Sequence, residues 1–206
     1  ITNVGHTAAN RPLIKTANSI SDYALSGGSD GIFFDGTNDR IEIPYHSDFN
    51  FGRSDFTIEM WFKCTDASAQ NMLFDYKYED FQIYTVNSPA YLYVDIRNWG
   101  TNVGLQSTTE IKDGIWYHAI IDRLDENSRL FLNGVCEEIE ANNNDIKLAT
   151  AAEPLHLGAR YNSGTGAYDY YHGGYIDEIR ISNMARYTGQ GLIDSDFPNP
   201  STEFGI

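Results

Sequence analysis

The chain has 206 residues, of which 41% are hydrophobic, 14% aromatic and 21% charged. That composition is typical of a globular protein, because disordered chains lack aromatic and β-branched residues. No apolar stretch approaches the roughly 18–20 residues of a membrane span, which argues against an integral membrane protein. Lys and Arg total 14 against 29 Asp and Glu, a formal net charge of −15. Because such a field repels phosphate backbones and anionic bilayers, we expect neither nucleic acid nor membrane insertion.

Short segments of alternating polar and apolar residues, separated by Gly, Asn, Asp and Ser, dominate the chain. In chain order the clearest expected strands are residues 40–43, 56–63, 91–96, 116–122, 129–132 and 174–182. Turn dipeptides such as Asn133-Gly134 agree with this spacing. No segment of a dozen residues has a helical stripe, and at most one helical turn fits residues 183–187. Many short strands with frequent turns predict an all-β, antiparallel sandwich.

The chain has no fixed-period repeat and no Pro- or Ser-rich linker, so we expect one domain over residues 1–206. Its core should run from about residue 31 to 186. The flanking stretches 1–30 and 187–206 are weaker in pattern and are expected to be arms. Cys64 and Cys136 lack the His partners of a zinc site. Whether these two thiols pair or stay isolated is open.

The order of six motifs resembles the laminin-G-like, concanavalin A-like lectin/glucanase superfamily. The motifs are Phe34–Pro44, Ser54–Lys63, Trp116–His118, Leu130–Gly134, Leu155–Gly158 and Gly174–Ile181. The resemblance implies a two-sheet jelly-roll sandwich, in which relatives bind sugars on a concave face or on the loops at its rim. The opening residues 1–5 and the closing segments 185–187 and 197–198 resemble tailed-phage virion proteins. That narrower similarity implies a virion or an extracellular location.

An enzyme is disfavoured. The glycanases of the superfamily carry a Glu-x-Asp-x-Glu-type strand that supplies nucleophile and general acid. No Glu in this chain is followed two residues later by Asp, and the carboxylates of residues 75–80 have a different spacing. Gly27–Gly31 matches the Gly-x-Ser-x-Gly pattern but lacks a strand before it and a helix after it. His118 and His156 lie inside expected strands, where packing is their more probable role.

Aromatic and polar loops are the candidate ligand site. Flat rings can cover the apolar faces of pyranosides, while Asn, Asp and Arg hydrogen-bond the hydroxyl groups. Residues 161–172 form an expected loop crowded with rings, and residues 97–102 and 74–78 are others. The candidate contacts are Tyr76, Tyr78, Trp99, Tyr161, Tyr168, Tyr170 and His172. Outward tyrosines serve protein contacts equally well.

A structural calcium ion is a further expectation from the resemblance. In the superfamily, an Asp of the final strand and carbonyls of an early loop often hold calcium at the sandwich edge. Asp177 occupies the matching position, and the loop that begins at Asp35 and Gly36 would complete the site. Alternation along residues 175–181 places the Asp177 carboxylate on the apolar side with Ile179 and Ile181, where an unpaired charge is costly. Hydrogen bonds from the same loop to Asp177 are the alternative to calcium.

We therefore expect a non-catalytic recognition or adhesion module of a virion or cell-surface protein, binding a surface polysaccharide. The alternative is a structural or protein-docking decoration domain without a sugar ligand, whose partners would be other virion or surface proteins.

Overall fold

The computed structural model describes the backbone of residues 2–4, 13–16 and 23–26, and residues 31–44, 46–76, 80–98, 101–146 and 154–187. Its strands are β1 (Thr2–Val4), β2 (Leu13–Thr16), β3 (Tyr23–Ser26), β4 (Ile32–Asp35), β5 (Arg40–Ile43), β6 (Phe56–Cys64), β7 (Asn71–Tyr76), β8 (Phe81–Val86), β9 (Tyr91–Asn98), β10 (Thr101–Gln106), β11 (Tyr117–Leu124), β12 (Asn127–Leu132), β13 (Val135–Ala141), β14 (Leu155–Leu157), β15 (Arg160–Asn162), β16 (Ala167–Asp169) and β17 (Gly173–Ser182). A short 3-10 helix spans Ser47–Phe49.

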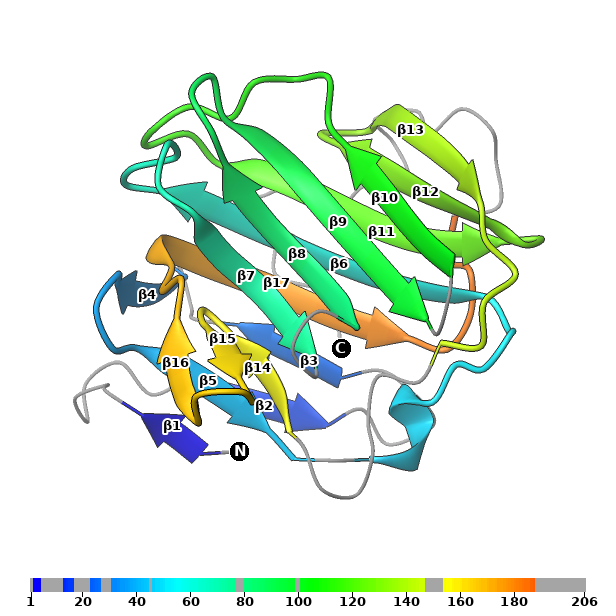
Figure 1. The fold of residues 1–206 in the computed structure, drawn as a ribbon, viewed down its shortest axis with the longest axis horizontal. Helices are drawn as coiled ribbons and strands as arrows, with labels where there is room; N and C mark the ends of the chain where they lie inside the picture. The colour runs from blue at the N-terminus through cyan, green and yellow to red at the C-terminus, as the bar shows by residue number, and fades with distance from the viewer. Residues whose placement is uncertain are drawn as a thin grey trace.

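Within these ranges the strands build two antiparallel sheets that face each other, with a small hairpin beside them (Figure 1). The seven-stranded sheet has the order β1-β5-β14-β7-β8-β9-β10. The eight-stranded sheet has the order β13-β12-β11-β6-β17-β3-β2, and β4 also pairs with β17. Strands β15 and β16 form the hairpin. The prediction of an all-β, two-sheet antiparallel sandwich is confirmed.

The core lies between the two sheets because successive side chains of a strand point to opposite faces. In β6 the residues predicted to share one face, Phe56, Ile58, Met60 and Phe62, are fully buried. They meet the inward residues of the opposite sheet, such as Phe74 and Phe81, whose rings contact each other at 5.6 Å. Burial of these apolar side chains is the main stabilising contribution to the fold. The alternation read from the sequence therefore gives the correct core face for β6.

A bulge in β17 changes which side chains face inward. The pairing of β17 with β6 shifts register between Asp177 and Arg180, and Glu178 has a positive φ of 48°. A bulge adds one residue to one strand, so the alternation changes phase there. Ile176 is buried before the bulge, and Ile179 and Ile181 are buried after it. The expectation that Asp177 shares a face with Ile179 and Ile181 is thus wrong; Asp177 lies on the face opposite Ile176.

Segments expected to be arms contribute strands at the sheet edges. Strand β1 pairs with β5, and β2 and β3 extend the eight-stranded sheet beyond β17. Residues 183–187 are not helical. The tail from residue 188 lies outside the described residues. Cys64 and Cys136 are both free, with Cys64 in the core. In the described part of the chain, no helix is long and apolar enough to cross a membrane.

Candidate functional site

A row of polar side chains crosses the outer face of the seven-stranded sheet. Consecutive register pairs join Glu42, His156, Asp75, Gln82, Asp95 and Gly104, from β5 to β10. Their chain neighbours, such as Ile41 and Phe74, point into the core, so alternation directs this row outward. The outer face of this sheet is therefore polar from one side to the other.

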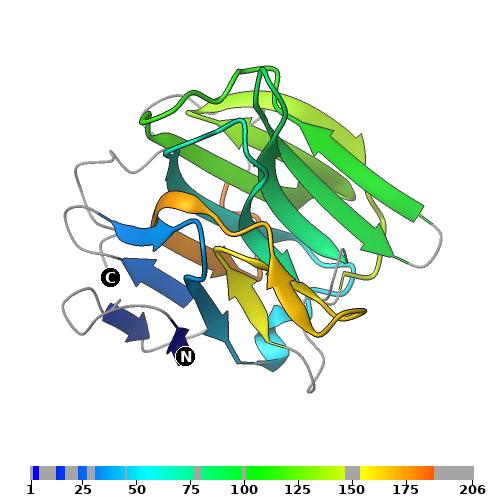
Figure 2. The same ribbon diagram turned by 60° about the vertical axis from the view of Figure 1, so that its left-hand side comes forward.

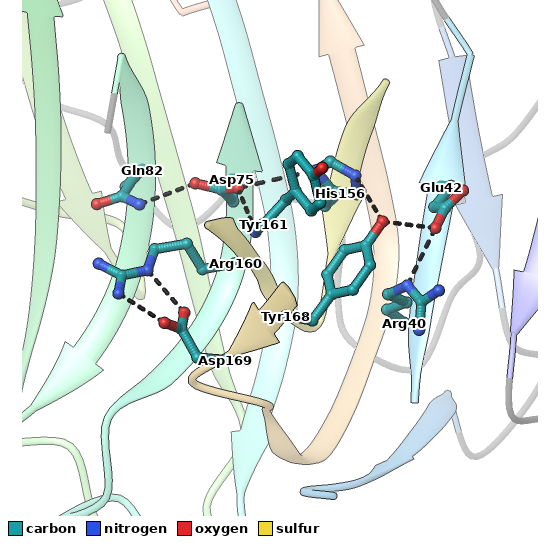
Figure 3. A network of polar contacts seen from close by, with 9 residues as sticks. All are labelled: Arg40, Glu42, Asp75, Gln82, His156, Arg160, Tyr161, Tyr168 and Asp169. Atoms are coloured by element: carbon teal, nitrogen blue, oxygen red, sulfur yellow. Dashed lines mark hydrogen bonds and ion pairs between the residues drawn. The ribbon is translucent and has the colours of Figure 1, made fainter. Parts of the chain in front are cut away.

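The β15–β16 hairpin covers the first half of that row (Figures 2 and 3). Asp75 is fully buried beneath it. Its Oδ1 accepts a hydrogen bond from Gln82 Nε2 at 2.8 Å, and its Oδ2 accepts one from the Tyr161 backbone N–H at 3.0 Å. His156 Nδ1 lies 3.7 Å from the same carboxylate. Asp75 therefore anchors the hairpin to β7 and has no surface that a ligand could touch.

Tyr168 fixes the other strand of the hairpin to β5. Its hydroxyl donates to Glu42 Oε1 at 2.7 Å and lies 3.3 Å from His156 Nε2. Arg40 donates to the same Glu42 oxygen at 3.0 Å, and its guanidinium carbon lies 3.8 Å above the Tyr168 ring. Burial works to raise the pKa of Glu42, but the hydrogen bonds from Tyr168 and Arg40 outweigh it and lower that pKa. Burial, and then Glu42, raise the pKa of Tyr168 to about 12.

Arg160, Asp169 and Tyr170 lie at the side of the hairpin that borders the uncovered half of the seven-stranded sheet. We call these three residues the wall. Arg160 and Asp169 pair across the hairpin through two hydrogen bonds of 2.7 and 2.8 Å. The guanidinium of Arg160 also lies 4.1 Å from the ring centroid of Tyr170, which is 38% exposed. Two parallel hydrogen bonds of this kind hold both partners in one geometry. Figure 3 shows Arg160 pointing toward Gln82 of β8, at the edge of the covered region.

Beyond this wall, β8 and β9 present half-buried rings and charges. The Tyr84 and Tyr93 rings stack with centroids 5.6 Å apart and an interplanar angle of 14°. The Tyr84 hydroxyl donates to Asp95 Oδ2 at 3.1 Å, and Arg97 lies 3.4 Å from the same oxygen. Burial and the charge of Asp95 raise the pKa of Tyr84. These contacts hold the Asp95 carboxylate and the two rings in fixed positions.

Strand β10 completes this surface. Its exposed outer side around Gly104 is called the floor below. Asn102, Gly104 and Gln106 are exposed and point to the same side. A Cβ added to Gly104 would meet only Asp95 Oδ1, at an ordinary 3.8 Å, so the space above Gly104 is free. We call Tyr84, Tyr93, Asp95, Arg97, Asn102, Gly104 and Gln106 the open face. It offers rings, amides, a carboxylate and a guanidinium around an open floor, which is the chemistry that sugar hydroxyls and C–H faces require.

The corresponding outer face of the eight-stranded sheet is partly closed by the chain itself. Glu59 of β6 is fully buried there and is contacted by Arg180, Arg186 and Tyr187. Arg129 donates to the Tyr187 carbonyl oxygen, and Thr57 to that of Met184. Residues 184–187 therefore cover the middle of this sheet, whereas the β8–β10 region of the other sheet has no such cover among the described residues.

The structure divides the predicted ligand contacts into three groups. Tyr161, Tyr168 and Tyr170 belong to the hairpin and its wall, and residues 160–162 and 167–169 are paired strands rather than the expected loop. Tyr76 and His172 are fully buried, so their rings offer no surface to a sugar, and neither residue is part of the open face. Trp99 and Tyr78 lie outside the described residues.

Tyr84, Tyr93 and Asp95 are not among the contacts predicted from the sequence. A signal for two of them was present, because the alternation of residues 91–96 sets Tyr91, Tyr93 and Asp95 on the polar side of an expected strand. Tyr84 and Gly104 have no such signal, since only the strand pairing brings them to the same surface.

The residues predicted to hold calcium are not brought together. Asp35 pairs with Gly173, whereas Asp177 lies beside Gly31, four residues further along the β4 pairing. Four residues of extended chain span about 13 Å. Asp35 Oδ1 instead accepts from the backbone of Thr37 and Asn38, and Asp177 Oδ1 accepts from the Glu178 N–H.

The turn at Asp35 and Gly36 is thus held by hydrogen bonds to its own aspartate, and the separation along β4 argues against hydrogen bonds from this turn to Asp177. Among the described residues, no group of three His, Cys, Asp or Glu side chains could hold a metal ion. Calcium binding by this chain stays a prediction.

Comparison with known proteins identifies the family. The sequence pattern of the concanavalin A-like lectin/glucanases superfamily matches residues 35–189. The chain belongs to this superfamily. The match includes the hairpin and the open face, so both lie inside the family's own fold. No curated protein sequence matches the chain.

Solved structures agree with the fold. The Ruminococcus gnavus IT-sialidase CBM40 bound to alpha2,6 sialyllactose gives a TM-score of 0.61 at 16% identity, covering 81% of this chain and 94% of that one. Domain 4 of AbnA, a GH43 extracellular arabinanase from Geobacillus stearothermophilus, in complex with arabinotriose, gives 0.56 at 17% identity, covering 90% and 79%. The NanB sialidase from Streptococcus pneumoniae gives 0.60 at 18% identity; the match covers 77% of this chain but only 26% of NanB. At these identities the likeness establishes the fold alone.

Proposed function

We propose that this chain is a non-catalytic carbohydrate-binding module that binds glycans on the open face. The observation that carries the proposal is the surface around Gly104, where a stacked tyrosine pair and the Asp95–Arg97 pair flank an unfilled floor. A sugar ring laid on this floor would meet the side of Tyr93, and its hydroxyls would reach Asp95, Asn102 and Gln106. Such a platform combines apolar contact with fixed polar partners.

Two neighbours in fold support a sugar ligand. The Ruminococcus gnavus module is described with sialyllactose and the Geobacillus stearothermophilus domain with arabinotriose. Both superpose over most of their own length. A virion or extracellular setting, with adhesion as its purpose, stays a prediction.

The carboxylates of the polar row favour binding over hydrolysis. A glycosidase general acid must hold a proton near neutral pH, which requires a raised pKa. Hydrogen bonds from Tyr168 and Arg40 keep the pKa of Glu42 low, and Asp75 is buried with both oxygens hydrogen-bonded. We therefore expect no release of sugar products when the protein is incubated with the oligosaccharides that it binds.

The test is a glycan array probed with the full chain and with two variants of the open face. Gly104→Val fills the floor, and because the Gly104 backbone lacks a positive φ and the space above it is free, it should fold normally. Valine also favours strands by up to about 1 kcal/mol. Tyr93→Ala removes one ring of the stacked tyrosine pair and should weaken binding roughly three- to tenfold. We expect selective binding of neutral glycans that Gly104→Val abolishes without lowering the melting temperature.

Ile139→Ala is the control, because Ile139 lies on β13 of the eight-stranded sheet and is 55% exposed. Binding of neutral glycans that persists unchanged in Gly104→Val would remove the open face as the site. Silence of the folded protein across all glycans would favour the alternative of a docking or spacer domain.

A further inference from the structure

A second row of aromatic side chains crosses the outer face of the eight-stranded sheet, on the other side of the sandwich from the open face. Phe33 of β4 pairs with Tyr175 of β17, which pairs with Lys63 of β6. Trp116 immediately precedes β11, where Tyr117 pairs with Phe62, so Trp116 comes next to Lys63. We call Phe33, Tyr175, Lys63 and Trp116 the aromatic–lysine row. It brings three rings and one ammonium group together from four separate strands or their ends.

The rings of this row are in contact but not buried. Phe33 and Tyr175 lie 5.0 Å apart between centroids, and Trp116 and Tyr175 lie 6.1 Å apart. Phe33 is 36% exposed, and the adjoining Ile115 is 50% exposed. Large side chains that stay exposed together cost free energy in water, so such a patch is a candidate contact surface.

Lys63 gives the row a positive centre. Its Nζ lies 4.2 Å from the Tyr175 ring centroid and 4.7 Å from that of Trp116. Ammonium groups bind the faces of aromatic rings in this way. No carboxylate among the described residues forms an ion pair with Lys63, in a chain with 29 acidic residues and 14 Lys and Arg. The Lys63 charge is therefore positioned by rings and remains available to an external anion.

An acidic neighbour on the same face limits what that anion can be. Asp177 lies on the same face as Tyr175, two residues further along β17, and its Oδ1 accepts from the Glu178 N–H. Its carboxylate disfavours an anion that carries several negative charges. The net charge of −15 repels any ligand that carries many negative charges. A single carboxylate on an otherwise neutral, ring-shaped ligand satisfies both conditions.

From these observations we infer that the aromatic–lysine row is a second glycan site, which binds a carboxylated sugar unit within an otherwise neutral saccharide. The sugar's C–H face packs on Trp116 and Phe33, and its carboxylate meets Lys63. This site lies on the sheet opposite the open face and does not depend on it.

Two glycosides that differ only at C6 test the charge requirement on the unaltered protein. The probes are methyl β-glucuronide, which carries a carboxylate, and methyl β-glucoside, which carries a hydroxymethyl group. The chain has three Trp residues, so ¹⁵N-labelled protein shows few indole N–H signals, and Trp116→Phe identifies that of Trp116. We expect the glucuronide to shift this signal saturably. The glucoside should bind about fivefold more weakly than the glucuronide, or not measurably.

Lys63→Met keeps the length of the side chain and removes its charge. We expect it to weaken glucuronide binding about three- to fivefold, with a melting temperature close to that of the parent. Gly104→Val is the matched control and should leave the Trp116 response unchanged, so a failure of the open face and a failure of this site give different results. An absent Trp116 response, equal responses to the two glycosides, or full binding by folded Lys63→Met would each overturn the inference.

Discussion

His118 and His172 are two buried histidines that make the stability of this fold sensitive to acid. His172 has no exposed surface; its Nε2 lies 3.4 Å from the Tyr175 carbonyl oxygen and its ring contacts Phe34. Burial lowers the pKa of His172 to about 4. Burial, together with the charge of Arg180, lowers the pKa of His118 to about 3. Both side chains are therefore neutral in the native state at pH values where an unfolded histidine is charged.

The direction of the pH dependence follows from these shifts. Below about pH 6.5 the unfolded chain binds protons that the native state excludes, so stability falls as the pH falls, down to the native pKa values. For His172 alone the loss at pH 5 is on the order of 2 kcal/mol. We expect the urea midpoint to decrease between pH 7 and 5, a range in which unperturbed carboxyl groups remain largely ionised.

The variant His172→Leu separates this contribution from others. It removes the titrating group from a buried position, so its urea midpoint should depend less on pH than that of the parent, whatever its absolute stability. Equal slopes for the two proteins between pH 7 and 5 would show that His172 does not titrate in this way.

At the scale of single elements, the β15–β16 hairpin depends on one of its two tyrosines more than on the other. Tyr161 and Tyr168 are cross-strand partners with ring centroids 5.1 Å apart. The Tyr168 hydroxyl donates to Glu42, whereas the Tyr161 hydroxyl has no hydrogen bond among the described residues. The two residues therefore form a matched pair for testing what holds the hairpin on the sheet.

We expect Tyr168→Phe to lower the free energy of unfolding by about 1–2 kcal/mol, because Glu42 loses a hydrogen bond at a part-buried site. Tyr161→Phe should change it by less than about 0.5 kcal/mol. Urea unfolding of both variants measures the difference. The argument fails when the two substitutions cost the same.

The β15–β16 hairpin and strand β17 are the two elements whose structure differs from the prediction made from the sequence. For residues 161–172 the Asn, Ser, Gly and Thr residues predict a loop, but the Arg160–Asp169 pair and the Tyr161–Tyr168 pair join residues 160–162 and 167–169 as strands. In β17 the alternation predicts Asp177 on the apolar side, and the bulge before Arg180 reverses it. Both outcomes depend on contacts between distant parts of the chain, and a one-residue change in register moves every following side chain to the other face.

At the scale of the whole molecule, the sequence predicts the architecture well. Alternation places Ile58, Met60 and Phe62 in the core, and the order of the six motifs indicates the superfamily that the family comparison then shows. The open face is harder to predict, since Tyr84, Asp95 and Gly104 come from three strands and meet only through pairing. Fold follows from local patterns repeated along the chain, whereas the site follows from the register between strands.

The excess of acidic residues is a property of the whole molecule. It predicts that all cations stabilise the fold by screening, an effect that can be distinguished from calcium binding at one site. A net charge of −15 destabilises the compact state by self-repulsion, so added salt of any kind should raise the melting temperature. Because the structure separates Asp177 from Asp35, we expect CaCl2 and MgCl2 at equal ionic strength to raise it equally, and EDTA at matched ionic strength to have no further effect. Differential scanning calorimetry measures these shifts. A rise with calcium that magnesium does not reproduce would instead establish a specific calcium site, as the family resemblance suggested, with ligands other than the Asp35 turn.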